Sequence, residues 1–248
     1  NLLLITFGLL SAYFGGLVLN DFVDVEHDKN QRPLRPIPMG IIPKKQATLI
    51  GSALLVLPVL IAMCTQARAA YFMIALSSCI LIYTFLHRYL LPSLIFMGVC
   101  RGLVYVVAFS AFDVAFQAEP LLIFAVGITW YTAVLTLIAK NEHMHNKTKR
   151  WFVLLLLPAA FIPAMIYFTQ FQLIFILLAL VIFTTWIAIT FVIFQLTSKS
   201  VHGIHAMLAG FCLLDFVYLY IIGELNIAII SGICFLFTLA AQRKILGT

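Results

Sequence analysis

Nine apolar runs, each close to twenty residues long, constrain the fold of this chain more than any other feature. One helix needs about 20 apolar residues to cross a bilayer core. The chain is 64% hydrophobic and its mean hydropathy is +1.11, which excludes a water-soluble protein. The predicted membrane spans are residues 2–20, 46–65, 69–87, 91–113, 119–139, 151–168, 172–196, 201–222 and 225–242.

The same runs predict the secondary structure. Backbone groups in lipid must bond one another, so a spanning segment is either a helix or a strand of a closed barrel. The runs lack the alternation of polar and apolar residues that barrel strands show. We therefore predict an all-α fold, a polytopic transmembrane helical bundle that forms one integral membrane domain over residues 1–248. Because Asn1 already lies inside an apolar run, we expect a leading helix to be missing before it.

The basic residues are distributed unevenly between the loops. Threading the nine spans alternately through a bilayer puts thirteen Lys and Arg residues on one side, against Arg68 on the other and Arg101 within a span. The positive-inside rule makes the thirteen-charge side cytoplasmic. The net charge of +6 thus reflects membrane topology, and no nucleic-acid partner is expected.

The stretch from Asn20 to Gly40, NDFVDVEHDKNQRPLRPIPMG, holds seven of the 24 formally charged residues. If the first span continues as a helix, Asn20, Asp24 and Asp28 lie within about 80° of one face, with Asp21 beside them. Two carboxylates 4 Å apart repel by roughly 4 kcal/mol at an effective dielectric constant near 20, so a cation is expected there. Oxygen ligands alone favour Mg²⁺. The alternative is a solvated amphipathic turn at the membrane surface.

Two linked motifs in this stretch resemble a known family. NDFVDVEHD at residues 20–28 and RPIPMG at residues 35–40 are similar to the patterns NDxxDxxxD and RPxPxG, the first signature of the UbiA superfamily of intramembrane prenyltransferases. A fainter resemblance is to the EboC-like branch of that superfamily. The resemblance implies a helical bundle around a cavity, with Asp-rich motifs at cytoplasmic helix ends that hold Mg²⁺ against an allylic diphosphate. The family places this motif at the end of its second helix, whereas here it ends the first predicted span.

A second matching region lies between the third and fourth predicted spans. Tyr83-x-x-x-His87-Arg88 is similar to the YxxxKR region of the family, with His87 in place of the usual Lys. A histidine makes the positive charge at that position depend on pH. Together the motifs imply catalytic roles for Asp24, Asp28, Tyr83 and Arg88, Mg²⁺ binding by Asn20, Asp21, Asp24, Asp28 and Glu142, and diphosphate binding by Arg35, His87 and Arg88. Arg101 is a further candidate for diphosphate binding because of its position within a span.

The chain departs from the family at the second acidic motif. The family has DxxxD or a longer Asp series at the end of the span that here carries Trp130 and Tyr131. This chain has KNEHMHN at residues 140–146, in which Glu142 is the sole carboxylate and Asn141 and two histidines are the other candidate ligands. The resemblance therefore implies a weaker or altered second Mg²⁺ site.

Two ionisable residues lie in the middle of predicted spans. Arg101 and Asp215 occupy positions where a charge costs at least about 2.5 kcal/mol, which marks the interior of a bundle. They either pair with each other, or Arg101 contacts substrate oxygens.

The resemblance implies a membrane prenyltransferase that moves an isoprenoid chain from a polyprenyl diphosphate donor to a small acceptor, with Mg²⁺-dependent loss of diphosphate. One alternative is a non-catalytic, prenyltransferase-like protein that binds an isoprenoid or another lipid, which the reduced second motif favours. A transporter is a third hypothesis, although the sequence shows no clear inverted repeat. The acceptor and the length of the donor chain are not specified by these motifs.

Overall fold

The computed structural model describes residues 2–112, 118–142, 147–167, 173–196 and 201–244. Within these ranges all regular secondary structure is helical, and eight helices are long and apolar enough to cross a membrane. Many large apolar side chains on these helices are exposed, Leu3, Tyr71 and Phe237 among them, as expected for surfaces that face lipid. The prediction of an all-α, multi-pass membrane protein is confirmed.

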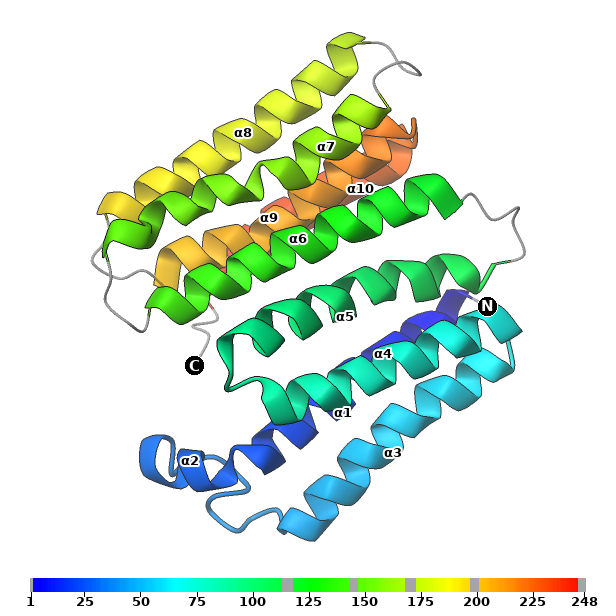
Figure 1. Ribbon diagram of the computed structural model, residues 1–248, viewed down its shortest axis with the longest axis vertical. Coiled ribbons are helices and arrows are strands. Elements are labelled where there is room, and N and C mark those ends of the chain that lie inside the picture. The colour runs from blue at the N-terminus through cyan, green and yellow to red at the C-terminus, as the bar shows by residue number, and fades with distance from the viewer. Residues whose placement is uncertain (1, 113–117, 143–146, 168–172, 197–200, 245–248) are drawn as a thin grey trace. The chain divides into compact units, whose positions relative to one another are not determined.

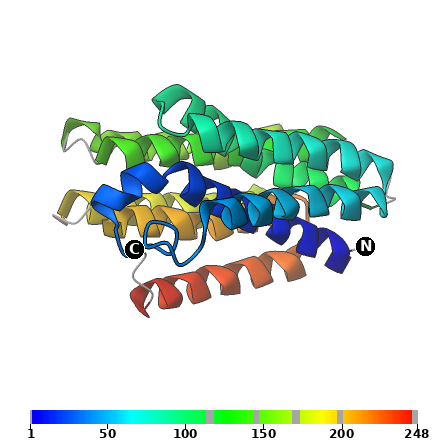
Figure 2. The same cartoon turned by 90° about the horizontal axis from the view of Figure 1, so that it is seen from below.

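The chain divides into two compact units, and the first is Asn1–Ala125. Its helices are α1 (Leu2–Val23), α2 (Val25–Gln31), α3 (Lys44–Met63), α4 (Ala67–Leu86), α5 (Leu90–Ser110) and the first turns of α6 (Ala118–Glu142). Helix α1 packs chiefly against α3, α3 against α4, and α4 against α5. Two perpendicular views show α3 running beside α1, with α2 and the loop that follows it at one end of this unit (Figure 1 and Figure 2).

The second unit is Val126–Thr248. It contains the rest of α6 and then η1 (Lys147–Leu156), α7 (Pro158–Ile166), α8 (Leu173–Leu196), α9 (Val201–Ile221) and α10 (Leu225–Lys244). Helix α9 is its central element, because α7, α8 and α10 all pack against it. Two buried tyrosines satisfy their hydroxyl groups on backbone carbonyls, Tyr131 on Met207 at 2.7 Å and Tyr218 on Ala159 at 2.8 Å. Such bonds are needed where lipid offers no partner.

One predicted span differs from the structure. In place of one continuous α-helix over residues 151–168, the structure has the end of η1 followed by α7. This apolar stretch, Trp151–Ile166, is shorter than the eight long helices. Pro158 has no N–H group with which to continue an α-helix. The Leu157 N–H bonds the Leu154 carbonyl at 3.2 Å, the tighter pattern of a 3₁₀ turn. The described residues therefore contain eight helices of spanning length, and the shorter apolar stretch Trp151–Ile166 lies where the sequence predicts a further span.

The α1–α3 contact positions the acidic stretch, because that stretch continues directly from α1. A Cβ atom on Gly15 would lie 3.1 Å from the Gly51 carbonyl oxygen and 3.1 Å from the Leu54 carbonyl carbon. Ser11, one turn earlier, donates a hydrogen bond to the Leu54 carbonyl at 2.9 Å. Close approach of two backbones over small residues is a common way for membrane helices to associate. Gly15 therefore fixes where α1 sits on α3.

We expect Gly15→Val to lower the free energy of unfolding by about 1–3 kcal/mol, because the atoms that a larger side chain meets are backbone atoms of α3. Thermal unfolding of the detergent-solubilised protein, followed by circular dichroism, measures the change. Gly232→Val in α10 is the control, since a Cβ there has its nearest neighbour, Phe216 Cδ2, at 3.8 Å. Equal melting temperatures for the two variants would contradict the close α1–α3 contact.

Candidate functional site

The acidic stretch begins where α1 breaks. Helix α1 ends at Val23, Asp24 has φ −85° and ψ 0°, and α2 starts at Val25. The backbone bonds still follow helical spacing across the break, because Asp24 N bonds Asn20 O at 3.0 Å and Asp28 N bonds Asp24 O at 2.8 Å. The expected continuation of the helix is thus present with a bend at Asp24. The bend gives neighbouring carboxylates different partners.

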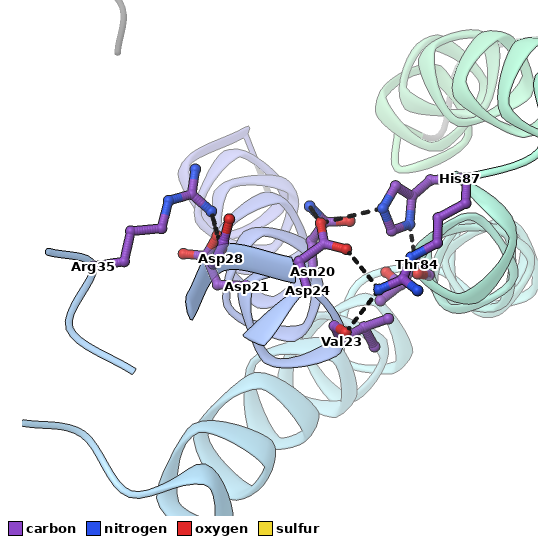
Figure 3. A network of polar contacts seen from close by, with 9 residues as sticks. Asn20, Asp21, Val23, Asp24, Asp28, Arg35, Thr84 and His87 are labelled. Carbon is purple, nitrogen blue, oxygen red and sulfur yellow. Dashed lines mark hydrogen bonds and ion pairs between the residues drawn. The ribbon is translucent and has the colours of Figure 1, made fainter. Parts of the chain in front are cut away.

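Asp24 faces the turn between α4 and α5. Its Oδ2 lies 3.2 Å from His87 Nε2, and its Oδ1 lies 3.3 Å from Arg88 Nη2. Asn20 donates from Nδ2 to Asp24 Oδ2 at 3.5 Å (Figure 3). Arg88 also donates to the Val23 carbonyl at 3.3 Å. Asn20, His87 and Arg88, which come from different sequence motifs, therefore meet at one carboxylate.

His87 is suited to a cationic role in this cluster. Its Nδ1 lies 2.8 Å from the Thr84 carbonyl oxygen, while its Nε2 faces Asp24. Both neighbours are oxygen acceptors, and only the protonated imidazolium has a donor for each. The Tyr83 ring lies on the same side of α4, with its centroid 5.9 Å from that of His87. The sequence analysis missed Thr84. It lies three residues before His87, a helical spacing at which a backbone carbonyl can contact a side chain.

Arg35 joins the other two carboxylates. Its Nη1 donates to Asp21 Oδ1 at 2.8 Å and to Asp28 Oδ2 at 2.7 Å. Figure 3 shows Arg35 and His87 approaching the acidic stretch from opposite sides. The Asp28 side chain is only 5% exposed, so this ion pair neutralises a carboxylate that has almost no contact with solvent. Asp28 and Asp21 thus form a second cluster, separate from that of Asp24.

The proline-rich loop positions Arg35. The Ile41 and Ile42 amides both bond the Pro36 carbonyl, at 3.0 and 3.2 Å, and the Gly40 amide bonds the Ile37 carbonyl at 3.0 Å. Gly40 has φ +77°, a conformation that residues with a Cβ rarely adopt. The RPIPMG motif is therefore a closed turn, which explains why its proline and glycine positions matter for the placement of Arg35.

An apolar pocket of about 220 Å³ opens beside the Asp24 cluster, between α1, α4 and α5. Asn20, Tyr83, Thr84 and Arg101 are among its lining residues, and most of the others are apolar. The structure therefore brings Tyr83 and Arg101, two sequence-predicted site residues, to the same pocket as Asn20. Arg101 belongs to the first unit and Asp215 to the second, so their pairing stays a prediction.

The second motif contributes less to the described structure. Glu142 is the last residue of α6, and its side chain lies outside the described residues, as do His143 and His145. The Asn141 amide nitrogen bonds the Leu137 carbonyl of its own helix at 2.8 Å. A metal-binding role for Glu142 stays a prediction.

The oxygen atoms of Asn20 and of the aspartates in the acidic stretch are of the type that Mg²⁺ binds. Within the described part of the chain, no group of three or more His, Cys, Asp or Glu residues is gathered tightly enough to hold a metal ion. Asn20 Oδ1, however, is buried and has no hydrogen-bond partner. The nitrogen of the same amide group, Nδ2, donates to Asp24. A buried acceptor of this kind requires a partner, and amide and carboxylate oxygens are what Mg²⁺ binds in proteins.

Glu26, two residues after Asp24, differs from the other acids of this stretch. It is fully exposed on α2, and hydrogen bonds from Lys44 at 2.7 Å and from Lys29 at 3.0 Å lower its pKa. It stays ionised on surface lysines, and it takes no part in either cluster. This makes Glu26 a matched control for Asp24.

The fold and the site define a polytopic α-helical membrane protein with a cluster of carboxylates and cations beside an apolar pocket, which Asn20 of the cluster also lines. The chain belongs to the UbiA prenyltransferase family, whose family model matches residues 1–202. A solved structure from work on digeranylgeranylglyceryl phosphate synthase in membranes has the same fold, with a TM-score of 0.67 at 17% identity, over 90% of this chain and 85% of that one. Membership of the EboC-like branch stays a prediction.

Two curated relatives are similar to parts of the chain. A 4-hydroxybenzoate octaprenyltransferase of Pseudomonas fluorescens is 24% identical over 147 residues, which are 57% of this chain and 49% of that protein. A digeranylgeranylglyceryl phosphate synthase of Pyrococcus horikoshii is 39% identical over 92 residues, 36% of this chain and 32% of that protein. The matches span about half and about a third of the lengths of these relatives.

We expect Arg35→Gln to destabilise the protein, because it leaves the buried Asp28 carboxylate without its cation. The free energy of unfolding should fall by about 1–3 kcal/mol, less than for a fully buried pair because Arg35 is 31% exposed. Thermal unfolding in detergent is the measurement, and Lys44→Gln, at the exposed pair with Glu26, is the control. Adding Asp28→Asn to Arg35→Gln should recover part of the loss. Equal melting temperatures for Arg35→Gln and the control would show that the ion pair does not matter.

Proposed function

We propose that this chain is a membrane prenyltransferase that transfers an isoprenoid chain from an allylic diphosphate to a small acceptor, with Mg²⁺ as its cofactor. The observation that carries the proposal is the Asn20–Asp24–His87–Arg88 cluster beside an apolar pocket that Asn20 lines. A molecule with a charged head and an apolar tail matches that arrangement. The printed names of the two curated relatives, an octaprenyltransferase and a digeranylgeranylglyceryl phosphate synthase, support this substrate class.

The metal would be held by oxygens of the acidic stretch. Asn20 Oδ1 and the Asp24 carboxylate are the first candidates, with Asp28 and Asp21 in the cluster next to them. When bound, Mg²⁺ neutralises diphosphate oxygens and so makes diphosphate a better leaving group. Glu142 is the candidate ligand from the second motif.

The cations of the site would bind the diphosphate. His87 and Arg88 lie on Asp24, Arg35 lies on the proline-rich loop, and Arg101 lines the pocket. In the reaction the bond between the allylic carbon and the bridging oxygen breaks, and its electron pair leaves with the diphosphate. Fixed positive groups stabilise the charge that develops on those oxygens.

The pocket would control the fate of the allylic cation. Its mostly apolar lining excludes water, which would otherwise capture the cation as an alcohol. The Tyr83 ring, which lines the pocket, would offer a π-face to the positive charge. An electron pair of the acceptor then forms the new bond to the allylic carbon, and the acceptor loses a proton to the released diphosphate or to solvent. The uneven distribution of Lys and Arg supports a cytoplasmic location for this end of the helices.

We expect Asp24→Asn to reduce the release of diphosphate from geranylgeranyl diphosphate by about 100-fold or more, because it removes a charge from the metal-binding cluster. The protein is assayed in nanodiscs with and without Mg²⁺, with a panel of aromatic and polar acceptors. Glu26→Gln makes the same kind of change two residues away, on an exposed carboxylate that pairs with lysines, and should keep the wild-type rate. Similar losses in both variants would argue against a specific role for Asp24.

The alternative function is that of a lipid-binding protein without catalysis. The reduced second motif is the observation that favours it. In residues 140–146 Glu142 is the only carboxylate. Saturable binding of the donor with no diphosphate release, for any donor length and any acceptor, would support that function. Release that depends on Mg²⁺, on Asp24 and on one acceptor would establish the transferase.

A further inference from the structure

We propose that the proline-rich loop docks on the surface of an anionic bilayer, with Leu34, Met39 and Ile41 inserted among the lipid headgroups. These three side chains, which we call the apolar loop surface, are 83%, 53% and 67% exposed. Large apolar side chains that are exposed together mark an interaction surface. The inference does not depend on the transferase activity, because it concerns only the contact between the first unit and the membrane.

The turn itself does not require apolar side chains at these positions. The hydrogen bonds that close it join backbone atoms, since the Met39 amide bonds the Arg35 carbonyl at 3.0 Å and the Ile41 amide bonds the Pro36 carbonyl at 3.0 Å. A polar residue with an N–H group could donate the same bonds. The placement of Arg35 therefore does not account for the apolar loop surface, and a contact outside the turn does.

The apolar loop surface is continuous with a side of α3 that faces lipid. A mostly apolar pocket of about 220 Å³ lies between the loop, α1 and α3, and the exposed residues Ile42 and Ile50 both line it. Leu49, next to Ile50, is 71% exposed on a helix that is long and apolar enough to cross a membrane. Transfer of such side chains from water to lipid is favourable. Lipid that covers this side of α3 therefore reaches Ile42 and its neighbour Ile41.

The start of α3 sets the level of the loop in the membrane. The loop joins α3 at Lys44, its first residue, and Lys45 follows (Figure 1). A lysine at the end of a spanning helix keeps its apolar stem beside lipid and its charge among the headgroups. Ile42 and Ile41 come just before these lysines, so they lie at the level of the headgroups.

The exposed charges around the loop favour a membrane that contains anionic lipid. Lys29 and Lys44 share one carboxylate, that of Glu26, which leaves an excess of positive charge. Arg32 and Lys45 are exposed as well. Basic residues beside an apolar surface attract anionic lipid headgroups. An anionic bilayer surface therefore matches both the charge of this region and its continuity with α3.

Photo-crosslinking of the full chain tests this contact directly. The photoreactive residue p-benzoylphenylalanine is placed singly at Leu34 or Ile41, in nanodiscs of phosphatidylcholine and phosphatidylglycerol, and mass spectrometry identifies the adducts. We expect phospholipid adducts at both positions, as at Leu49, the lipid-facing control. Gln31, a polar and exposed residue at the end of α2, should give about tenfold less lipid adduct.

Two results of this experiment would overturn the proposal. One is lipid labelling at Leu34 and Ile41 that is no stronger than at Gln31. The other is adducts between two copies of the chain in place of lipid adducts, which would assign the apolar loop surface to a protein–protein contact.

Arg32→Gln combined with Lys45→Gln tests the preference for anionic lipid. We expect the enrichment of phosphatidylglycerol over phosphatidylcholine among the Leu34 adducts to fall by about fivefold or more, because two exposed positive charges are lost. Glu26→Gln combined with Lys29→Gln is the control, since it removes one charge of each sign and should keep the enrichment. Wild-type enrichment in the Arg32 and Lys45 variant would overturn the assignment of anionic headgroups to these residues.

Leu34→Ser combined with Ile41→Ser tests whether docking restrains the turn that holds Arg35. In nanodiscs we expect hydrogen exchange at the amides of residues 40–42 to become about tenfold faster or more, because the turn loses its apolar contact with the bilayer. Leu49→Ser makes the same kind of change on α3 and should leave these rates unchanged. Both loop residues are exposed, so the packed core of the first unit is not altered. Wild-type exchange rates in the double variant would overturn the docking of the turn.

Discussion

The carboxylates that end α1 cannot lie side by side without positive charge between them, and the rest of the site follows from how the chain supplies it. Asp28 is nearly buried and is neutralised by Arg35, while Asp24 pairs with Arg88 and lies 3.2 Å from His87 Nε2. These partners come from two segments, Arg35 from the proline-rich loop and His87 and Arg88 from the α4–α5 turn. Charge neutralisation thus ties both segments to the end of α1.

This arrangement places two kinds of environment next to each other. The ion pairs lie at one end of the first unit, and the apolar pocket continues from them between α1, α4 and α5. A bilayer surface has the same sequence of environments, from charged headgroup to hydrocarbon. An amphiphilic substrate of the proposed kind would therefore find similar surroundings for its head and its tail in the membrane and at the site.

Hydropathy was sufficient to predict most of the fold. Eight predicted spans agree with the helices to within a few residues, because a long apolar run in lipid has no alternative to a helix. The span predicted over residues 151–168 corresponds to a shorter apolar stretch, Trp151–Ile166, and hydropathy did not predict its change from 3₁₀ to α geometry at Pro158, which has no N–H to donate.

The motifs predicted which side chains are candidates for a site, but they did not predict how the structure groups these side chains. Helical spacing placed Asn20, Asp24 and Asp28 on one face, yet the bend at Asp24 and the positions of Arg35 and His87 divide the acids into two clusters. Those positions depend on contacts between segments far apart in the sequence. The pocket was not predictable for a similar reason. An apolar residue such as Leu9 or Ile80 looks the same in the sequence whether its side chain faces lipid or a cavity.

The buried Asn20 Oδ1, which has no hydrogen-bond partner, affects the stability of the protein without a ligand. A buried acceptor that lacks a hydrogen bond costs about 1–3 kcal/mol, and the protein bears this cost whenever nothing occupies that position. Any ion or molecule that supplies the missing partner binds the folded chain in preference to the unfolded one, and so raises its melting temperature. The search for the natural substrates of this chain can therefore begin as a thermal-shift screen in which no reaction needs to occur.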